Sequence, residues 1–102
     1  MTRPSFSSGK RDKNEPQILE VLDRYHIRYR QLRPGDGADL IVEIHPMCFV
    51  EVKNPEQPPN KRKLTEAEQD QRAYCTAAGI PYHVIETPEE MAAIISRYFE
   101  RL

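Results

Sequence analysis

The sequence predicts an α/β protein of the α+β type, with a mixed central sheet flanked by helices. Apolar and polar residues alternate through residues 38–53 on both sides of a break at His45-Pro46-Met47, which predicts an antiparallel hairpin. Helix-start signals stand at residues 14–16, 65–68 and 87–90. A strand, helix, strand segment follows the hairpin, and a crossover of this kind joins parallel strands.

The length and composition limit the possible classes of protein. A chain of 102 residues allows one domain with a modest core. We expect residues 1–13 to form a flexible arm, because they combine Ser, Gly, Pro and charge without periodicity, and residues 14–102 to form the domain. No apolar run approaches the roughly 20 residues of a membrane span, and no apolar signal segment follows Met1. We therefore expect a cytoplasmic protein with no membrane partner.

The first helix is expected to begin at residues 14–16, where Asn14 is a good cap and Pro16 is tolerated only in a first turn. Its buried stripe is predicted to comprise Ile18, Leu19, Leu22 and Tyr25. Glu15 stands at the head of this stripe. It is either a first-turn acid favoured by the helix dipole or a side chain that reaches the sheet.

The hairpin is predicted to separate a dry face from a charged face. A strand at residues 27–32 and a Gly-rich turn precede it. Alternation places one apolar set on the dry face: Leu40, Val42, Ile44, Cys48, Val50 and Val52. The other face carries Asp39, Glu43, Glu51 and Lys53, together with Ile41 and Phe49. Pairing centred on Pro46 would set Asp39 near Lys53 and Ile41 near Glu51.

The charged face has two interpretations. A solvated face with a cross-strand Glu–Lys pair would contribute only ~0.2 to 1 kcal/mol. Two observations favour a functional face instead. Asp39 opens a strand although Asp is a poor strand former, and Ile41 and Phe49 indicate that another element covers part of this face.

The second half of the chain supplies a loop, two helices and a strand. Three prolines in residues 54–63 argue against regular structure, and Lys61-Arg62-Lys63 either contact phosphates or are simply solvated. Thr65 and Glu68 form a predicted capping box. The helix that follows is expected to stop at Gly79. Its predicted buried stripe comprises Ala67, Gln71, Tyr74 and Ala78.

A strand at residues 82–86 and a final helix complete the predicted domain. Thr87 and Glu90 form a second capping box. The apolar stripe of the final helix is predicted as Met91, Ile94, Ile95, Tyr98 and Leu102. Three histidines, at positions 26, 45 and 83, have no partner at ligand spacing and receive no role. Cys48 and Cys75 likewise lack metal-ligand spacing, so we expect buried, reduced thiols.

The hairpin contains a spaced acidic motif: Asp39, then eleven residues, then Glu51-Val52-Lys53. This motif resembles the signature of the PD-(D/E)xK nuclease superfamily. The arrangement is most similar to the small stand-alone VRR-NUC (virus-type replication-repair nuclease) domains of phage-like proteins, and the likeness covers most of the chain. It implies a restriction-endonuclease-like core in the order αβββαβα. Ala38 replaces the family's usual Pro before the Asp. Glu68, with Gln69 adjacent, stands where the family often has Gln, so Glu68 is either catalytic or only a helix cap.

The resemblance implies a metal-dependent endonuclease that hydrolyses DNA phosphodiester bonds, with selectivity for branched or Holliday-junction DNA. By resemblance, Mg²⁺ or Mn²⁺ would be bound by Asp39, Glu51 and the backbone carbonyl of Val52, with Glu15 assisting. Lys53 would orient or deprotonate the attacking water, or stabilise the developing charge. The resemblance also implies a homodimer in a viral or bacterial intracellular setting.

Two other classes remain open on the sequence. The first is a catalytically inactive nucleic-acid-binding adapter that retains the nuclease fold. The second is a small regulatory protein that dimerises through the hairpin. Metal-dependent nicking distinguishes the first from a nuclease, and size exclusion with and without DNA distinguishes the second.

Overall fold

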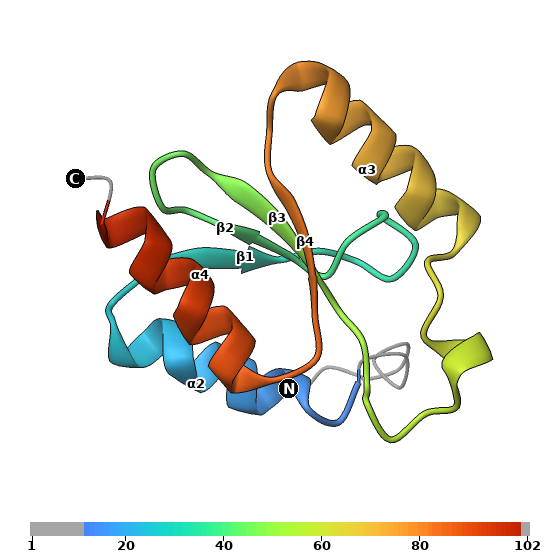
Figure 1. Ribbon diagram of the computed structural model, residues 1–102, viewed down its shortest axis with the longest axis horizontal. Helices are drawn as coiled ribbons and strands as arrows, with labels where there is room; N and C mark the ends of the chain where they lie inside the picture. Colours follow the sequence, from blue (N-terminus) through green and yellow to red (C-terminus); the bar gives the residue numbers. More distant parts are fainter. Residues whose placement is uncertain (1–11, 101–102) are drawn as a thin grey trace.

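The computed structural model describes residues 12–100, which form a four-stranded sheet and three α-helices (Figure 1). The elements follow in the order α2 (Glu15–Arg24), β1 (Tyr29–Gln31), β2 (Leu40–Val42), β3 (Cys48–Val52), a 3₁₀ turn η1 (Pro59–Lys61), α3 (Glu66–Ala78), β4 (Tyr82–Ile85) and α4 (Pro88–Glu100). Most of the predicted flexible arm, residues 1–11, and the predicted core residue Leu102 lie outside the described part. No helix in residues 12–100 has the length and apolar content to cross a membrane.

The sheet confirms the predicted mixture of antiparallel and parallel strands. Its order is β1-β2-β3-β4, and the β1–β2 and β2–β3 pairs are antiparallel. Strand β4 pairs in parallel with β3 after the crossover through α3. The mixed α+β class with helices beside the sheet is therefore correct. Strand β1 is shorter than expected.

The hairpin register differs from the prediction by two residues. Ile41 pairs with Phe49, and Val42 pairs with Cys48, so the turn is centred on His45 instead of Pro46. The predicted neighbours Asp39–Lys53 and Ile41–Glu51 are therefore wrong. A shift of two residues leaves every side chain on its predicted face, because the side-chain period of a strand is two.

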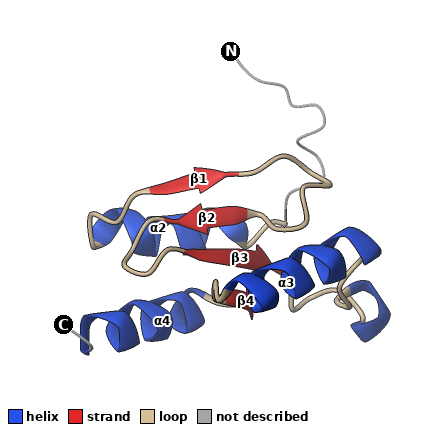
Figure 2. Ribbon diagram, turned by 90° about the horizontal axis from the view of Figure 1, so that it is seen from above, coloured by secondary structure: helices blue, strands red, loops and turns tan. Residues whose placement is uncertain are grey.

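Helices α2 and α4 cover one face of the sheet and build the core, whereas α3 lies on the opposite face, in front of β4 in Figure 2. The predicted dry face is confirmed, with five of its six residues buried: Leu40, Val42, Cys48, Val50 and Val52. Ile44 is partly buried against the same cluster. The predicted stripe of α4 is buried as well, over Met91, Ile94, Ile95 and Tyr98.

The other two predicted helix stripes are partly or wholly wrong. In α2, Ile18 and Leu22 are buried as predicted, but Tyr25 is 47% exposed and Val21 takes its place. In α3, Ala67, Tyr74 and Ala78 are exposed, and Cys75 is the buried residue of that helix. The reason is that α3 makes few contacts with the sheet, mainly through β4.

The predictions made from local signals at the helix ends are more accurate than those of the buried stripes. Thr65 and Glu68 form both hydrogen bonds of the capping box, and α3 ends at Gly79 in the left-handed conformation. Helix α2 begins where predicted, but the Asn14 side chain makes no cap hydrogen bond to it. The loop over residues 54–63 includes η1, contrary to expectation, since Pro is tolerated in a first helical turn.

Gly37 fixes the loop between β1 and β2 against α3 and β4. Its φ of +89° lies in the left-handed region, and a Cβ there would come within 2.6 Å of the Gln71 Cβ atom and 2.9 Å of the Ala67 carbonyl oxygen. The Tyr82 hydroxyl donates a 2.6 Å hydrogen bond to the Gly37 carbonyl oxygen. The chain that enters β2 at Asp39 is therefore held by both α3 and β4.

Replacing Gly37 by Ala should destabilise the protein by about 2 to 4 kcal/mol, because a strained backbone conformation is combined with a clash against α3. Gly35 is the matched control. Its φ is +91°, but a Cβ there would meet nothing within 4 Å, so Gly35→Ala should cost only about 1 to 2 kcal/mol. Urea unfolding of both variants measures the difference. Equal losses would show that the contact of Gly37 with α3 is unimportant.

Candidate functional site

A cavity of about 390 Å³ opens at the end of the sheet where β2 begins and β3 ends. Its walls include four of the predicted site residues: Asp39 directly before β2, Glu51 in β3, Lys53 directly after β3, and Glu68 in α3. We call this the carboxylate cavity. The structure thus brings together four of the five side chains that the sequence proposed as catalytic.

Asp39 and Glu51 lie on the same side of the sheet. Both side chains line the carboxylate cavity, and the charge of Asp39 acts on the Glu51 carboxyl. Asp39 directly precedes β2, and its backbone is bonded on both sides: its N–H donates to Val50 O of β3 at 3.0 Å, and its carbonyl accepts from Leu32 N at 2.8 Å. Two carboxylates can share one ion only if both face the same space, and Asp39 and Glu51 meet this requirement.

The backbone of Val52 belongs to the same site. Its N–H donates a 2.7 Å hydrogen bond to Asp39 Oδ2, which orients that carboxylate. In a strand the N–H and C=O groups of one residue point to the same side, so the Val52 carbonyl faces the side of Asp39. The Val52 side chain points the other way and is fully buried in the core.

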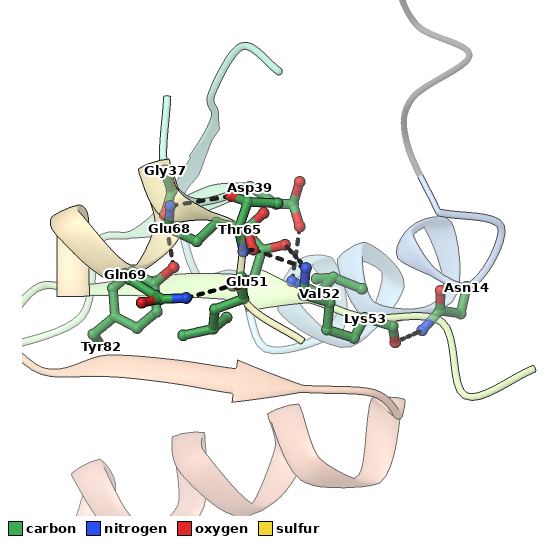
Figure 3. A network of polar contacts seen from close by, with 11 residues as sticks. Asn14, Gly37, Asp39, Glu51, Val52, Lys53, Thr65, Glu68, Gln69 and Tyr82 are labelled. Atoms are coloured by element: carbon green, nitrogen blue, oxygen red, sulfur yellow. Dashed lines mark hydrogen bonds and ion pairs between the residues drawn. The ribbon is translucent and has the colours of Figure 1, made fainter. Parts of the chain in front are cut away.

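Lys53 is the centre of the polar network drawn in Figure 3. Its Nζ lies 2.8 Å from Glu68 Oε1 and 3.3 Å from Glu51 Oε2, and its side chain is only 10% exposed. Burial alone would lower the pKa of Lys53, but the hydrogen bond to Glu68 and the charge of Glu51 outweigh it and raise that pKa. Lys53 is therefore an ammonium at neutral pH, suited to stabilise negative charge and unsuited to accept a proton.

Glu68 both caps α3 and contacts Lys53. One of its oxygens accepts from Thr65 N at 2.9 Å, as a capping residue does, and the same oxygen accepts from Lys53 Nζ. Desolvation acts to raise the pKa of Glu68, but these two hydrogen bonds lower it overall. The adjacent Gln69, also drawn in Figure 3, is exposed and donates its side-chain hydrogen bond to Leu64 O and not to an acid of the site.

The carboxyl of Glu51 experiences the opposite effect. Burial, the charge of Asp39 and the proximity of Glu68 raise its pKa to about 9. Asp39 and Glu68 act to raise this pKa, and the ammonium of Lys53 acts to lower it without offsetting them. Strongly shifted carboxyls of this kind gather at functional sites more often than elsewhere.

Glu15 is not among the residues that line the carboxylate cavity. Its side chain is 1% exposed and accepts a 3.0 Å hydrogen bond from Gln31 Nε2 of β1. The structure thus supports the interpretation that Glu15 reaches the sheet, but it places Glu15 beside β1. Asp12, which the sequence assigned to the flexible arm, lines the cavity instead.

The predicted nucleic-acid-binding run divides into separate roles. Lys61 lines the carboxylate cavity, as does Arg33 from the loop between β1 and β2. Arg62 forms a 3.2 Å ion pair with Glu86, so it anchors the loop after β3 to the end of β4 instead of facing a ligand. Lys63 is exposed and lies outside the cavity lining.

Oxygen donors are the ligands that Mg²⁺ and Mn²⁺ prefer, and Asp39, Glu51 and Glu68 supply them around one space. Within residues 12–100, no three His, Cys, Asp or Glu side chains are already arranged as ligands of one ion. The oxygens of Glu51 and Glu68 are instead engaged by Lys53. The donor chemistry therefore fits a divalent cation that competes with Lys53 for these oxygens.

No family model matches the chain, and neither a curated protein nor a solved structure matches it.

Replacing Glu51 by Gln should make stability less dependent on pH in a chelating buffer. Between the ordinary value of 4.5 and about 9, the folded state holds a proton on Glu51 that the unfolded state has lost, so this group weakens the fold as pH rises through that range. Gln is neutral at every pH. We expect Glu51→Gln to be more stable than the parent by about 1 to 2 kcal/mol at pH 8 to 9.

Thermal unfolding at pH 6 and pH 8.5 measures this effect. Glu20→Gln, at an exposed position on α2, is the control and should retain the pH slope of the parent protein. Equal slopes for the parent and Glu51→Gln would contradict the assigned protonation of Glu51.

Proposed function

We propose that this chain is a divalent-metal-dependent nuclease that hydrolyses DNA phosphodiester bonds, of the PD-(D/E)xK type and similar to VRR-NUC domains. The observation that carries the proposal is the convergence of Asp39, Glu51 and Lys53 on one cavity, with the Val52 backbone bonded to Asp39. The element order from α2 to α4 and the mixed sheet agree with the core expected for that superfamily.

The cation would be Mg²⁺ or Mn²⁺, bound by Asp39, Glu51 and the carbonyl of Val52. When bound, such an ion activates a water molecule and neutralises charge on the phosphoryl oxygens. The protein itself contributes the orientation of the Asp39 carboxylate through Val52 N, and an ammonium at Lys53 that stabilises the negative charge developing on phosphate. Since the pKa of Lys53 is raised, its role is electrostatic and it does not act as the base.

Glu68 acts as a positioning residue for Lys53. It fixes the ammonium at 2.8 Å, and the capping box in turn fixes Glu68 to the first turn of α3. Arg33 and Lys61 stand on the two loops that border the cavity, where they would contact phosphates on either side of the cleaved bond. A net charge of −1 makes such local cations necessary for binding a polyanion.

A single small domain offers little surface to a long duplex. We therefore include two features of the resembled family in the proposal: a homodimer as the active form, and branched or junction DNA as the preferred substrate. Size exclusion of the free protein and of its complex with a four-way junction tests the dimer.

The reaction is tested with four-way, flap and linear duplex DNA in Mg²⁺, Mn²⁺ or chelator. Asp39→Asn and Lys53→Met should each reduce cleavage by about 10²-fold or more, because each removes charge at the reacting centre. Asp70→Asn and Lys63→Met, at exposed positions outside the cavity, should cleave like the parent protein. Circular dichroism should show that all four variants are folded.

Full activity in Asp39→Asn would disprove the assignment. Metal-independent DNA binding without cleavage by the parent protein would favour the inactive adapter instead.

Glu68→Gln separates positioning from helix capping, because Gln also completes a capping box. We expect α3 to remain folded and cleavage to fall about 10-fold, since the closest partner of Lys53 loses its negative charge. The pKa of Lys53 should fall as well, so the alkaline limit of the pH–rate profile should move to lower pH. Glu66→Gln, exposed in the same helical turn, is the control. An unchanged profile in Glu68→Gln would show that Glu68 is only a cap.

A further inference from the structure

The segment that precedes α2 is bound to the end of β3. The Asn14 side-chain amide donates hydrogen bonds to Lys53 O at 3.1 Å and to Glu86 O at 2.7 Å. Glu15 N donates to Asp12 O at 3.1 Å, which closes a turn between these residues. Asp12 is therefore fixed relative to Lys53 by hydrogen bonds on the same short segment.

The Asp12 side chain is half-buried and lines the carboxylate cavity together with Asp39, Glu51 and Glu68. Burial raises the pKa of Asp12, the charge of Lys53 opposes this rise, and the charge of Glu68 adds to it. Asp12 thus lies within the electrostatic reach of the same ammonium and the same α3 carboxylate that form the centre of the site. It brings a fourth acidic side chain to a cavity whose lining also contains the cations Arg33, Lys53 and Lys61.

Glu15 differs from Asp12 in each of these respects. It is almost fully buried beside β1, and Gln31 donates to it. Its charge acts on Tyr29, which is also on β1, whereas Asp12 faces Lys53 and Glu68. The two acids are only three positions apart in sequence, but Asp12 lines the carboxylate cavity whereas Glu15 lies beside β1.

We propose that Asp12, and not Glu15, is the additional acidic residue that the start of the domain contributes to divalent-cation binding in the carboxylate cavity. The inference rests on the proposed function, because it assigns a ligand to the same site. Glu15 is then a structural residue that joins α2 to β1. Asp12 would bind the cation directly or through one of its water molecules.

The test is Mn²⁺ binding to the full chain, measured by isothermal titration calorimetry and by the electron paramagnetic resonance signal of free Mn²⁺. Asp12→Asn retains the backbone carbonyl that accepts from Glu15 N, and it should weaken Mn²⁺ binding about 10-fold. Glu15→Gln retains an acceptor for Gln31 and should bind Mn²⁺ like the parent protein. Asp70→Asn, at an exposed position on α3, is the control for loss of an acidic charge.

Thermal unfolding in chelator checks the fold of each variant, and Asp12→Ser is a second replacement if Asp12→Asn is unstable. The inference is overturned if the parent binds Mn²⁺ and the Asp12 variants bind it equally well, or if Glu15→Gln alone weakens binding. Absence of both Mn²⁺ binding and DNA cleavage in the parent protein would overturn the proposed function as well. Cleavage by the parent with unchanged Mn²⁺ affinity in Asp12→Asn would overturn only the inference.

Discussion

The ammonium of Lys53, held between Glu51 and Glu68, is the interaction on which the polar half of this structure depends. Buried charges are costly to remove from water, and an ion pair of this kind is rarely a net source of stability. Here burial and the nearby acids Asp39 and Glu68 raise the pKa of Glu51 in spite of the ammonium beside it. An arrangement that weakens the fold in this way is expected at a site that binds a ligand, and it is unexpected on a surface that is only solvated.

Strand β3 serves the core and the site at once. Val50 and Val52 point to the side of α2 and α4, where they are fully buried, while Glu51 and Lys53 point to the cavity. Alternation along one strand is enough to achieve this separation. The buried apolar side chains fix the position and direction of the strand. The charged side chains on its other face are therefore held by a rigid element and not by a loop.

The sequence predicted which face each hairpin residue occupies, because that depends only on the period of a strand. It did not predict the register, which depends on how the turn at His45 closes. The capping boxes at Thr65 and Thr87 were predictable because every hydrogen bond in them is local. The buried side of α3 was not, since helix periodicity cannot show how little of the sheet the helix will contact.

In the candidate site, too, local patterns were predictable and distant contacts were not. Asp39, Glu51, Lys53 and Glu68 were identified from spacing and resemblance, and the fold brings them to one cavity. Asp12 was missed because composition assigned it to an arm. Its place depends on two hydrogen bonds from Asn14 to distant strand ends, and no pattern within one segment encodes such contacts.

Because Cys75 is the buried residue of α3, apolar burial contributes little to the position of that helix. Three other contacts hold it: Gly37 against Ala67 and Gln71, the few contacts with β4, and the bond from Lys53 to Glu68. One of these belongs to the site itself. A change of charge at Lys53 or Glu51 therefore acts on the docking of α3, and a cation that displaced Lys53 from Glu68 would alter the same contact. Site chemistry and helix position are linked in this fold because the helix has no large apolar face to hold it independently.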